Sequence, residues 1–433
     1  MQRIKVTFCA YDKPDSVGGP VTWIQRLAPM LTARGIDVRC LFILHRGDTG
    51  PALSSLRAEG IPCEAVAGLD RTEDRVRWII DKLNLNPPDV FVPNLVVAAY
   101  FAARYARGAG ISTVGILHSD DTFYRGIADQ FVSGAAQYRV SSVVCVSSEL
   151  ERQMIERGPG GVRVARIPYG VDVPADRVHR IPGVLRLSYV GRLAEEQKRI
   201  SEVVRAFCGA AAQIDGVEAR IYGDGPDRSV VERILNEEGH GLPVHLAGRI
   251  DADRVQTELL RSDVIALLSD YEGLPIALLE AMACGCVPVC LRMRSGIGEL
   301  VEDGVTGLLV DDRTESFLGA VTRLRDDPAL WTRLSETARE HIARSFSSDS
   351  SADGWAALLR ELGGDGVERR KIHAPRKLGL PHVHPDLASA DVRDPHMPVS
   401  SKMYRTTRTF LGRLRRHFGD LTIRKARRPG EGD

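Results

Sequence analysis

Short apolar runs alternate with amphipathic segments along most of the chain, and this alternation limits the possible folds. In the first part, the apolar runs lie at residues 4–9, 38–44, 89–94, 112–118 and 142–147. Between the first two runs, PVTWIQRLAPMLTARG places its apolar residues at helical spacing, with Gly35 as a stop signal. Strands separated by helices predict right-handed βαβ units and a parallel sheet.

The same alternation starts again after a connection rich in Pro and Gly, near residues 170–183. The second set of expected strands lies at residues 185–192, 219–225, 244–250, 263–269, 287–292 and 306–310. We therefore expect an α/β protein with two doubly wound halves. Ligands of such sheets bind at the carboxyl ends of the strands, so a cleft between the halves is the expected site.

The composition is that of a globular protein with two domains and an appendage. The chain has 433 residues, of which 43% are hydrophobic and 27% are charged. No segment reaches the roughly 18 consecutive apolar residues that a bilayer span needs, and no sustained apolar run precedes Asp12, so we expect neither export nor membrane crossing. Eight cysteines are scattered mostly within apolar runs, which favours buried free thiols in a reducing cytosol. The cluster CGCVPVC lacks zinc-like partners, so no metal site is expected.

The C-terminal part differs in charge from the rest of the chain. Residues 364–433 hold 16 basic and 8 acidic residues, whereas the first 363 residues hold 42 and 49. The first half of this segment is rich in Pro and His and is typical of a linker. Residues 402–428 place aromatic and leucine side chains near one helical face among ten Lys and Arg. Such a helix can bind an anionic membrane surface, dock on the acidic body or remain disordered; nucleic-acid binding is not expected.

Two features of the first half are candidate ligand contacts. Gly18, Gly19 and Pro20 lie between the first strand and the first helix, where small residues and free amides favour an anion. An ordinary turn would look the same, and the absence of GxGxxG argues against a nicotinamide cofactor. His118 stands at the carboxyl end of a predicted strand. It could donate to a substrate hydroxyl or face developing charge, or it could be a structural histidine.

The second half offers two cations and two carboxylates. Arg192 follows a predicted strand and Lys198 stands six residues later, an arrangement that suits a diphosphate. In DYEGLPIALLEAMACG, Glu272 lies on a turn, and Glu280 lies on a helix expected to begin near Pro275 and to end at Gly285. Paired carboxylates are typical of glycoside hydrolases. A carboxylate also binds a vicinal diol, however, and the nearby cations favour a nucleotide sugar.

The segment SDYEGLPIALLEAMACGCVPV, with YVGRL, IPYGVD, YGDGP and GELVEDGVTGLLV, resembles the retaining glycosyltransferases of family 4 over about residues 1–360. The resemblance implies the GT-B architecture, in which two Rossmann-like domains face each other across a cleft. We expect an acceptor-side domain at 1–175 and a nucleotide-sugar domain at 176–345. A helix at 346–363 would return to the first domain, and 364–433 would form the linker and basic tail.

The resemblance also implies roles for individual residues. Glu272 would lie beside the transferred sugar and Glu280 would bind the ribose. Arg192 and Lys198 would hold the diphosphate. The remaining matches are Gly19 near the phosphates, Gly273 and Leu274 in the loop that approaches the sugar, and His118 near the reacting sugar. One departure is that the family commonly places its Lys five residues after the Arg, followed by Gly, whereas Arg199 follows here. This makes Arg199 an alternative to Lys198.

The implied function is the transfer of a sugar, with retention, from a nucleoside diphosphate sugar to the hydroxyl of a glycan, lipid-linked or small-molecule acceptor. The departing phosphate would act as the base, without metal or other cofactor. The expected setting is polysaccharide or glycolipid assembly in the cytoplasm, with a peripheral position at the inner face of the membrane as an option. The alternatives are a non-catalytic partner subunit that binds nucleotide sugar, and an epimerase or phosphorylase of the same fold.

Overall fold

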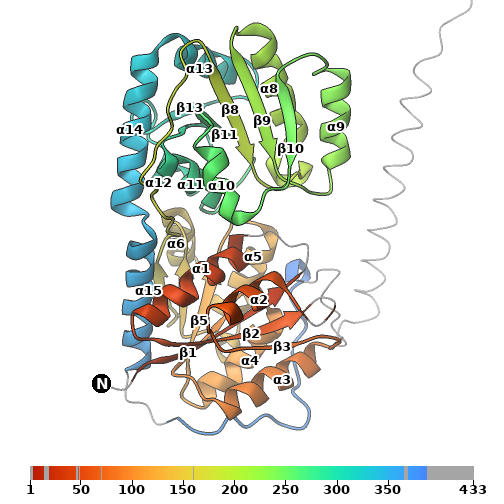
Figure 1. Cartoon of the computed structure of the whole chain (residues 1–433). Helices are drawn as coiled ribbons and strands as arrows, with labels where there is room; N and C mark the ends of the chain where they lie inside the picture. Colours follow the sequence, from red (N-terminus) through yellow and green to blue (C-terminus); the bar gives the residue numbers. More distant parts are fainter. Residues whose placement is uncertain are drawn as a thin grey trace, which may run out of the picture.

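The computed structural model describes residues 3–13, 19–44, 47, 49–69, 71–158, 160–364 and 369–387. Within these residues, the chain forms two parallel sheets in two α/β domains that face each other (Figure 1). This confirms the expected fold class with its two Rossmann-like domains. The basic tail at 402–428 lies outside the described residues.

The first sheet, as far as the structure describes it, has the strand order β3-β2-β1-β4-β5-β6-β7. Its strands are β1 Lys5–Asp12, β2 Asp37–Leu44, β3 Cys63–Val66, β4 Val90–Pro93, β5 Ser112–Leu117, β6 Ser142–Cys145 and β7 Arg163–Arg166. Its α-helices are α1 Gly19–Ala33, α2 Pro51–Ala58, α3 Thr72–Leu85, α4 Val97–Gly108, α5 Thr122–Ile127 and α6 Ser148–Glu156, with short helices η1 Ala128–Val132 and η2 Ala136–Tyr138.

The second sheet has the order β10-β9-β8-β11-β12-β13 within the described part of the chain. Its strands are β8 Leu185–Val190, β9 Val217–Tyr222, β10 Val244–Gly248, β11 Val264–Leu267, β12 Val287–Leu291 and β13 Leu308–Val310. Its helices are α7 Glu195–Lys198, α8 Ile200–Gln213, α9 Arg228–Glu237, α10 Ala252–Leu259, α11 Ile276–Cys284, α12 Ile297–Leu300, α13 Glu315–Asp326 and α14 Pro328–Ser345.

The apolar runs of the sequence become the central strands of both sheets. β1, for example, pairs in parallel with both β2 and β4, and its middle residues are buried. The sequence analysis missed β3 and β7, which lie at the two edges of the first sheet. Their residues are only half-buried or exposed, so neither strand needs the continuous apolar run that marks a central strand.

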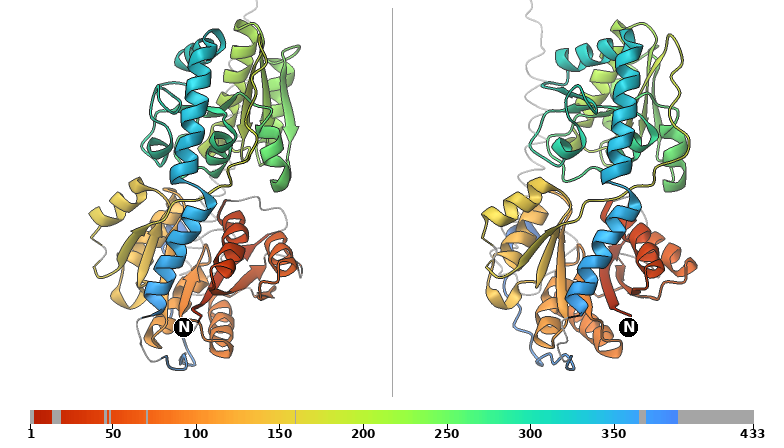
Figure 2. Two further views of the ribbon diagram at one scale, coloured as in Figure 1. Left: turned by 60° about the vertical axis from the view of Figure 1, so that its left-hand side comes forward. Right: turned by 90° about the vertical axis from the view of Figure 1, so that its left-hand side faces the viewer.

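Helix α15, Ser348–Gly363, follows α14 but packs against α1 and β4 of the first domain. Figure 2 shows α14 and α15 running one after the other along both domains. The indole of Trp355 is fully buried, with its centroid 5.2 Å from that of Trp23 on α1 and 6.5 Å from the ring of Phe8 on β1. We therefore propose domain limits at 1–175 and 176–345, with 346–363 returning to the first domain.

Residues 369–387, here called the strap, run along the first domain and end in the short helix η3, Pro385–Leu387. Asn84 of α3 holds the strap with two hydrogen bonds to the backbone of Ile372, at 2.8 and 3.0 Å. Gln130 does the same further along, donating to the carbonyl of His382 at 3.1 Å and accepting from the amide of His384 at 2.9 Å. The sequence predicted only an irregular linker here. Its docking depends on amide side chains that satisfy an irregular backbone.

Candidate active site

The glutamate-containing turn joins a buried strand to a buried helix. β11 leads into residues 268–275, and α11 begins directly after Pro275, which adopts an extended backbone suited to a helix start. Gly285 ends the helix in the left-handed region, at φ 90°, a conformation that favours glycine. Both helix limits match the sequence prediction. Because α11 is buried on most sides, the positions of Glu272 before it and Glu280 within it are fixed by packing.

Lys198 and Glu272 lie side by side at the carboxyl ends of the neighbouring strands β8 and β11. Lys198 Nζ is 2.5 Å from Glu272 Oε1, and the side chains are 16% and 7% exposed. Removing two charges from water is unfavourable unless they compensate each other, and this pair does so. The structure therefore brings together a cation and a carboxylate that the sequence placed 74 residues apart.

Gln197 was not predicted, although it joins the two loops directly. Its carbonyl accepts from the amide of Asp270 at 2.9 Å, and its side-chain amide donates to the carbonyl of Tyr271 at 2.9 Å. The same amide lies 3.5 Å from the second oxygen of Glu272. A glutamine in a polar loop carries no signal in a single sequence, so only the fold shows its role.

Arg192 follows β8, and its side chain is exposed. Its carbonyl accepts a hydrogen bond of 2.8 Å from the hydroxyl of Tyr189, whose pKa is raised by burial. Across the part of the chain that the structure describes, no ion pair involves the Arg192 guanidinium. Within the described residues its guanidinium therefore carries an unpaired charge, on the same segment after β8 that leads to Lys198.

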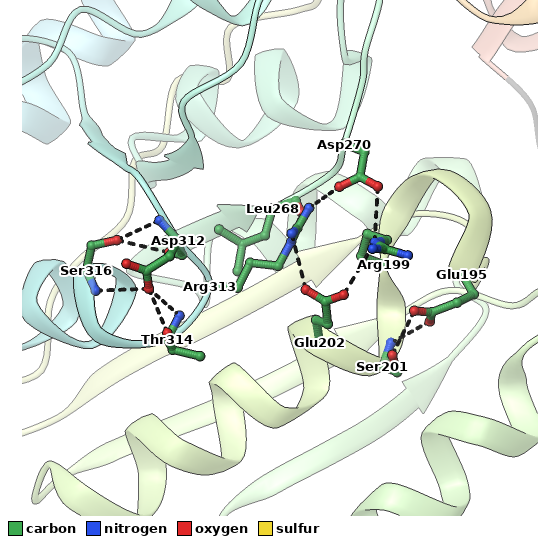
Figure 3. Close-up of polar contacts among 10 residues, drawn as sticks. All are labelled: Glu195, Arg199, Ser201, Glu202, Leu268, Asp270, Asp312, Arg313, Thr314 and Ser316. Carbon is green, nitrogen blue, oxygen red and sulfur yellow. Dashed lines mark hydrogen bonds and ion pairs between the residues drawn. The ribbon is translucent and has the colours of Figure 1, made fainter.

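Arg199 is turned away from the position that would let it replace Lys198. Its Nε lies 3.1 Å from Asp270 and 3.3 Å from Glu202, both in the second domain (Figure 3). The backbone of Arg199 adopts the left-handed conformation at φ 50°. The geometry thus favours Lys198 over Arg199 as the diphosphate ligand.

Glu280 is bound by a residue of the opposite domain. Arg26 Nη2 on α1 lies 2.6 Å from Glu280 Oε1 on α11, with side-chain exposures of 37% and 18%. Sequence reasoning missed Arg26, because an arginine on an amphipathic helix is usually solvated. The second carboxylate oxygen of Glu280 has no hydrogen bond to any residue that the structure describes.

The predicted glycines lie where the domains approach most closely. A Cβ on Gly19, at the start of α1, would lie 3.3 Å from the Ile276 side chain at the start of α11. A Cβ on Gly273 would lie 2.1 Å from the carbonyl oxygen of His118, which excludes any side chain there. The carbonyl of Gly273 accepts from the amide of Gly296 at 2.9 Å. Leu274, the next residue of the loop, is buried.

His118 is buried in the first domain with both ring nitrogens bonded. Its Nε2 lies 2.7 Å from the carbonyl oxygen of the Asn94 side chain, and its Nδ1 contacts the hydroxyl of Tyr169. Nε2 therefore carries the proton and donates to Asn94, while Nδ1 accepts from Tyr169. Burial lowers the pKa of His118 to about 3, so the ring is neutral. A direct contact with substrate would require the ring to give up one of these partners.

The sequence predicts no metal site, and the acidic, histidine and cysteine side chains of the described residues are arranged as follows. Among the described residues, no group of three or more His, Cys, Asp or Glu side chains is arranged to hold a metal ion. All eight cysteines are free, and Cys284, Cys286 and Cys290 of the CGCVPVC cluster are buried. No helix in the described ranges is both long and apolar enough to cross a bilayer.

Comparisons with known proteins agree with this geometry. The family model described as glycosyl transferases group 1 matches residues 178–341, and the model described as a glycosyl transferase 4-like domain matches residues 18–170. The chain is similar to the alpha-D-kanosaminyltransferase of Streptomyces kanamyceticus, with 27% identity over 61% of this chain and 75% of that protein. A GDP-mannose-dependent alpha-(1-6)-phosphatidylinositol dimannoside mannosyltransferase of Mycobacterium tuberculosis is 28% identical over 82% and 94%.

Solved structures show the same fold at low sequence identity. Anabaena HepE in complex with UDP and glucose superimposes with a TM-score of 0.67 at 18% identity, covering 83% of this chain and all of that one. The sucrose-phosphate synthase of Thermosynechococcus elongatus gives a TM-score of 0.66 at 18% identity, covering 84% and 100%. The two family models together span most of the chain, one in each domain. The chain therefore belongs to the family 4 type of glycosyltransferases, with the GT-B fold.

Proposed function

We propose that this glycosyltransferase moves a sugar from a nucleoside diphosphate sugar to a hydroxyl acceptor, with retention and without a metal ion. The observation that carries the proposal is the buried Lys198–Glu272 pair after the adjacent strands β8 and β11, with the exposed Arg192 on the same segment as Lys198. A diphosphate needs cations that are already in position, and the sugar needs a carboxylate acceptor for its hydroxyls.

The leaving group is stabilised by Arg192 and Lys198. Charge builds on the diphosphate as its bond to the sugar breaks, and a cation fixed in a site of low dielectric stabilises that charge more than one in water. Lys198 is the better fixed of the two, because it is mostly buried and held by Glu272. When the donor binds, the phosphate oxygens share Lys198 with this carboxylate.

The nucleotide and the sugar are bound by the turn and by α11. We assign the ribose diol to Glu280, whose second oxygen is available beside its bond to Arg26. Gly273 and Leu274 bring the backbone to the sugar and phosphates, and Gly19 does so from the first domain. Glu272 orients the sugar hydroxyls, and the departing phosphate oxygen takes the proton of the acceptor.

His118 serves this reaction through its backbone. Its carbonyl lies where the Gly273 loop meets the first domain, and its ring is fixed by Asn94 and Tyr169. A neutral, rigid ring keeps that carbonyl in place when the domains close. The direct contact with the sugar that the resemblance implies requires one of these two hydrogen bonds to break when the donor binds.

The acceptor belongs to polysaccharide or glycolipid assembly. Relatives with names in these pathways support this class, among them the phosphatidylinositol dimannoside mannosyltransferase and a colanic acid biosynthesis glycosyltransferase of Salmonella typhimurium. We propose a cytoplasmic protein that reaches the inner face of the membrane through residues 402–428, where ten basic residues favour anionic lipids. Deletion of residues 400–433 should abolish sedimentation with anionic vesicles and leave donor binding unchanged; continued sedimentation would refute the membrane role.

The experiment that tests the proposal is product formation by the full chain. The protein is incubated with UDP-glucose or GDP-mannose in the presence of EDTA, with and without glycan and lipid-linked acceptors, and the products are identified by mass spectrometry. Acceptor-dependent transfer with an unchanged anomeric configuration by NMR supports the proposal. Conversion of the donor without acceptor would indicate an epimerase or phosphorylase, and binding without turnover would indicate a non-catalytic subunit.

A further inference from the structure

The loop that carries Lys198 has a strained residue next to the proposed diphosphate ligand. Arg199 adopts φ 50° and ψ 46°, a left-handed conformation that is unfavourable for a residue with a side chain. Such a conformation persists only where the surrounding contacts impose it. The contacts of Arg199 therefore indicate what fixes the position of Lys198.

Those contacts form a closed ring of alternating charges, drawn in Figure 3. Arg199 Nε lies 3.1 Å from Asp270 and 3.3 Å from Glu202. Arg313 contacts the same two carboxylates, with Nη1 at 3.2 Å from Glu202 and Nη2 paired with Asp270. Two guanidinium groups thus share two carboxylates, and Asp270 stands two residues before Glu272.

Arg313 is the best anchored member of this ring. Its side chain is only 15% exposed, and its Nε donates to the carbonyl of Leu268 at 2.7 Å, at the end of β11. The backbone next to it is fixed by Asp312, which accepts from the amides of Thr314 at 2.7 Å and Ser316 at 3.2 Å. The hydrogen bonds from Thr314 also lower the pKa of Asp312.

The other end of the Lys198 loop is fixed in a similar way. Glu195 accepts from the amide of Ser201 at 3.1 Å and from its hydroxyl at 2.8 Å, which ties the start of α7 to the start of α8 (Figure 3). Lys198 therefore lies between a closed turn and the ring of charges. Its freedom to move away from Glu272 depends on both.

We propose that Arg313 is a positioning residue for sugar transfer, which acts through Asp270 and Arg199 to hold Lys198 and Glu272 in register. The inference rests on the proposed function of that pair. Arg313 touches neither Lys198 nor Glu272 in any contact of the described chain. It binds Leu268 and Asp270 on the turn that carries Glu272, and Glu202 on α8. Asp270 and Glu202 in turn pair with Arg199, the residue next to Lys198.

The first test does not depend on activity. Arg313→Met is compared with Arg292→Met, a control in the same domain whose arginine also pairs with two carboxylates, Asp303 and Asp311. Hydrogen–deuterium exchange should be faster in segments 194–200 and 268–274 of the Arg313 variant, where the Asp270 amide bonds to the Gln197 carbonyl. Unchanged exchange in these segments would overturn the inference, whatever reaction the protein catalyses.

The second test separates positioning from general destabilisation. With UDP-glucose or GDP-mannose as donor, Arg313→Met should lower kcat roughly tenfold to a hundredfold, with little change in the donor KM, because misplaced catalytic groups act mainly on the transition state. Arg313→Lys should not restore activity, because one ammonium cannot reproduce three contacts of a guanidinium. Asp270→Asn provides a second variant with the same expected split in case the first does not fold.

The decisive comparison is made in a Lys198→Met background. If Arg313 acts through Lys198, its substitution should have less than a threefold further effect on kcat there. A full tenfold or larger loss in that background would show that Arg313 acts independently of Lys198 and would overturn the inference. If no donor is turned over by the wild type, the proposed function fails, while the exchange test still decides whether Arg313 holds the loops.

Discussion

In the second domain the site residues Lys198 and Glu272 are held by an ion pair, whereas in the first domain the ring of His118 is held by neutral hydrogen bonds and ring contacts. Lys198 and Glu272 compensate each other's charge, and Arg199 and Arg313 share two carboxylates beside them. In the first domain, the neutral ring of His118 lies between Asn94 and Tyr169.

Under the proposed function, this difference indicates which domain stabilises the charge that develops on the leaving diphosphate. Fixed cations stabilise a leaving diphosphate, so the second domain suits the departure of the nucleotide. A buried, neutral imidazole supplies no charge, so under the proposed function we expect His118 to contribute shape and rigidity rather than charge. Arg26, which reaches from α1 to Glu280, is the exception among the contacts described above.

The largest expected effect comes from removing the ammonium group of Lys198 from the second domain. Lys198→Met should lower kcat/KM by roughly 10² to 10³, as does loss of a main electrostatic contact to developing charge. Steady-state kinetics with the accepted donor measure this. Arg292→Met removes an exposed arginine of the same domain that has no described contact with Lys198 or Glu272, and it should retain wild-type rates. A fall of less than fivefold for Lys198→Met would contradict the assignment.

Gly273→Ala tests the contact between the Gly273 loop of the second domain and His118 of the first domain. The added Cβ would lie 2.1 Å from the His118 carbonyl oxygen, and a backbone atom cannot move aside without shifting the domain. We expect a loss of activity of about tenfold to a hundredfold, because closure positions the reacting groups. Gly319→Ala, on α13 with no atom within 4 Å of the new Cβ, is the matched control. Equal activities of the two variants would mean that the observed approach is not needed for transfer.

Glu280→Ala sharpens the assignment of nucleotide binding to the second domain. Losing a carboxylate that accepts from a diol should weaken binding of the nucleoside diphosphate about tenfold, since hydrogen bonds to charged groups contribute about 1.5–3 kcal/mol. Isothermal titration calorimetry measures this, with circular dichroism as the check on folding. An unchanged dissociation constant would remove the ribose assignment.

The buried, neutral ring of His118 predicts that the stability of the protein depends on pH. His118 has a folded-state pKa of about 3, below the unfolded value of 6.5, so the unfolded chain binds the proton first. The contribution of His118 is fully present above pH 6.5 and is lost as the pH falls toward 3, at up to about 1.4 kcal/mol per pH unit. Denaturant unfolding between pH 7.5 and 4.5 should show a shallower slope for His118→Asn than for the wild type. The exposed His245→Asn serves as control, and a wild-type slope in His118→Asn would contradict the neutral assignment.

The smallest effect is expected for Arg26→Gln, because partly exposed ion pairs contribute about 0.2–1 kcal/mol. Nucleotide affinity should change by less than fivefold. A loss of more than tenfold in the same titration would show that Arg26 itself contacts the donor. The first domain would then contribute charge, contrary to the comparison drawn here.

Periodicity predicted the central strands and the limits of α11, because buried elements leave a continuous or helical apolar pattern. It missed β3 and β7, since edge strands need no such pattern. The meeting of Lys198 with Glu272 follows from strand order, because β8 and β11 are neighbours whose carboxyl ends share one edge. The bond between Arg26 and Glu280 depends on how the domains face each other, and the partners of His118 lie 24 and 51 residues away. Neither the Arg26–Glu280 bond nor the partners of His118 can be predicted from the residues next to them in the sequence.

Under the proposed function, the charged loops of the second domain bind a nucleoside diphosphate. The most direct measurement is a thermal shift of the wild type and of Lys198→Met with UDP, GDP and ADP in the presence of EDTA. At 100 times the dissociation constant, a bound nucleotide should stabilise the wild type by about 2.7 kcal/mol, with a smaller shift in the variant at the same concentration. The absence of a shift with every nucleotide, or equal shifts in both proteins, would contradict the account.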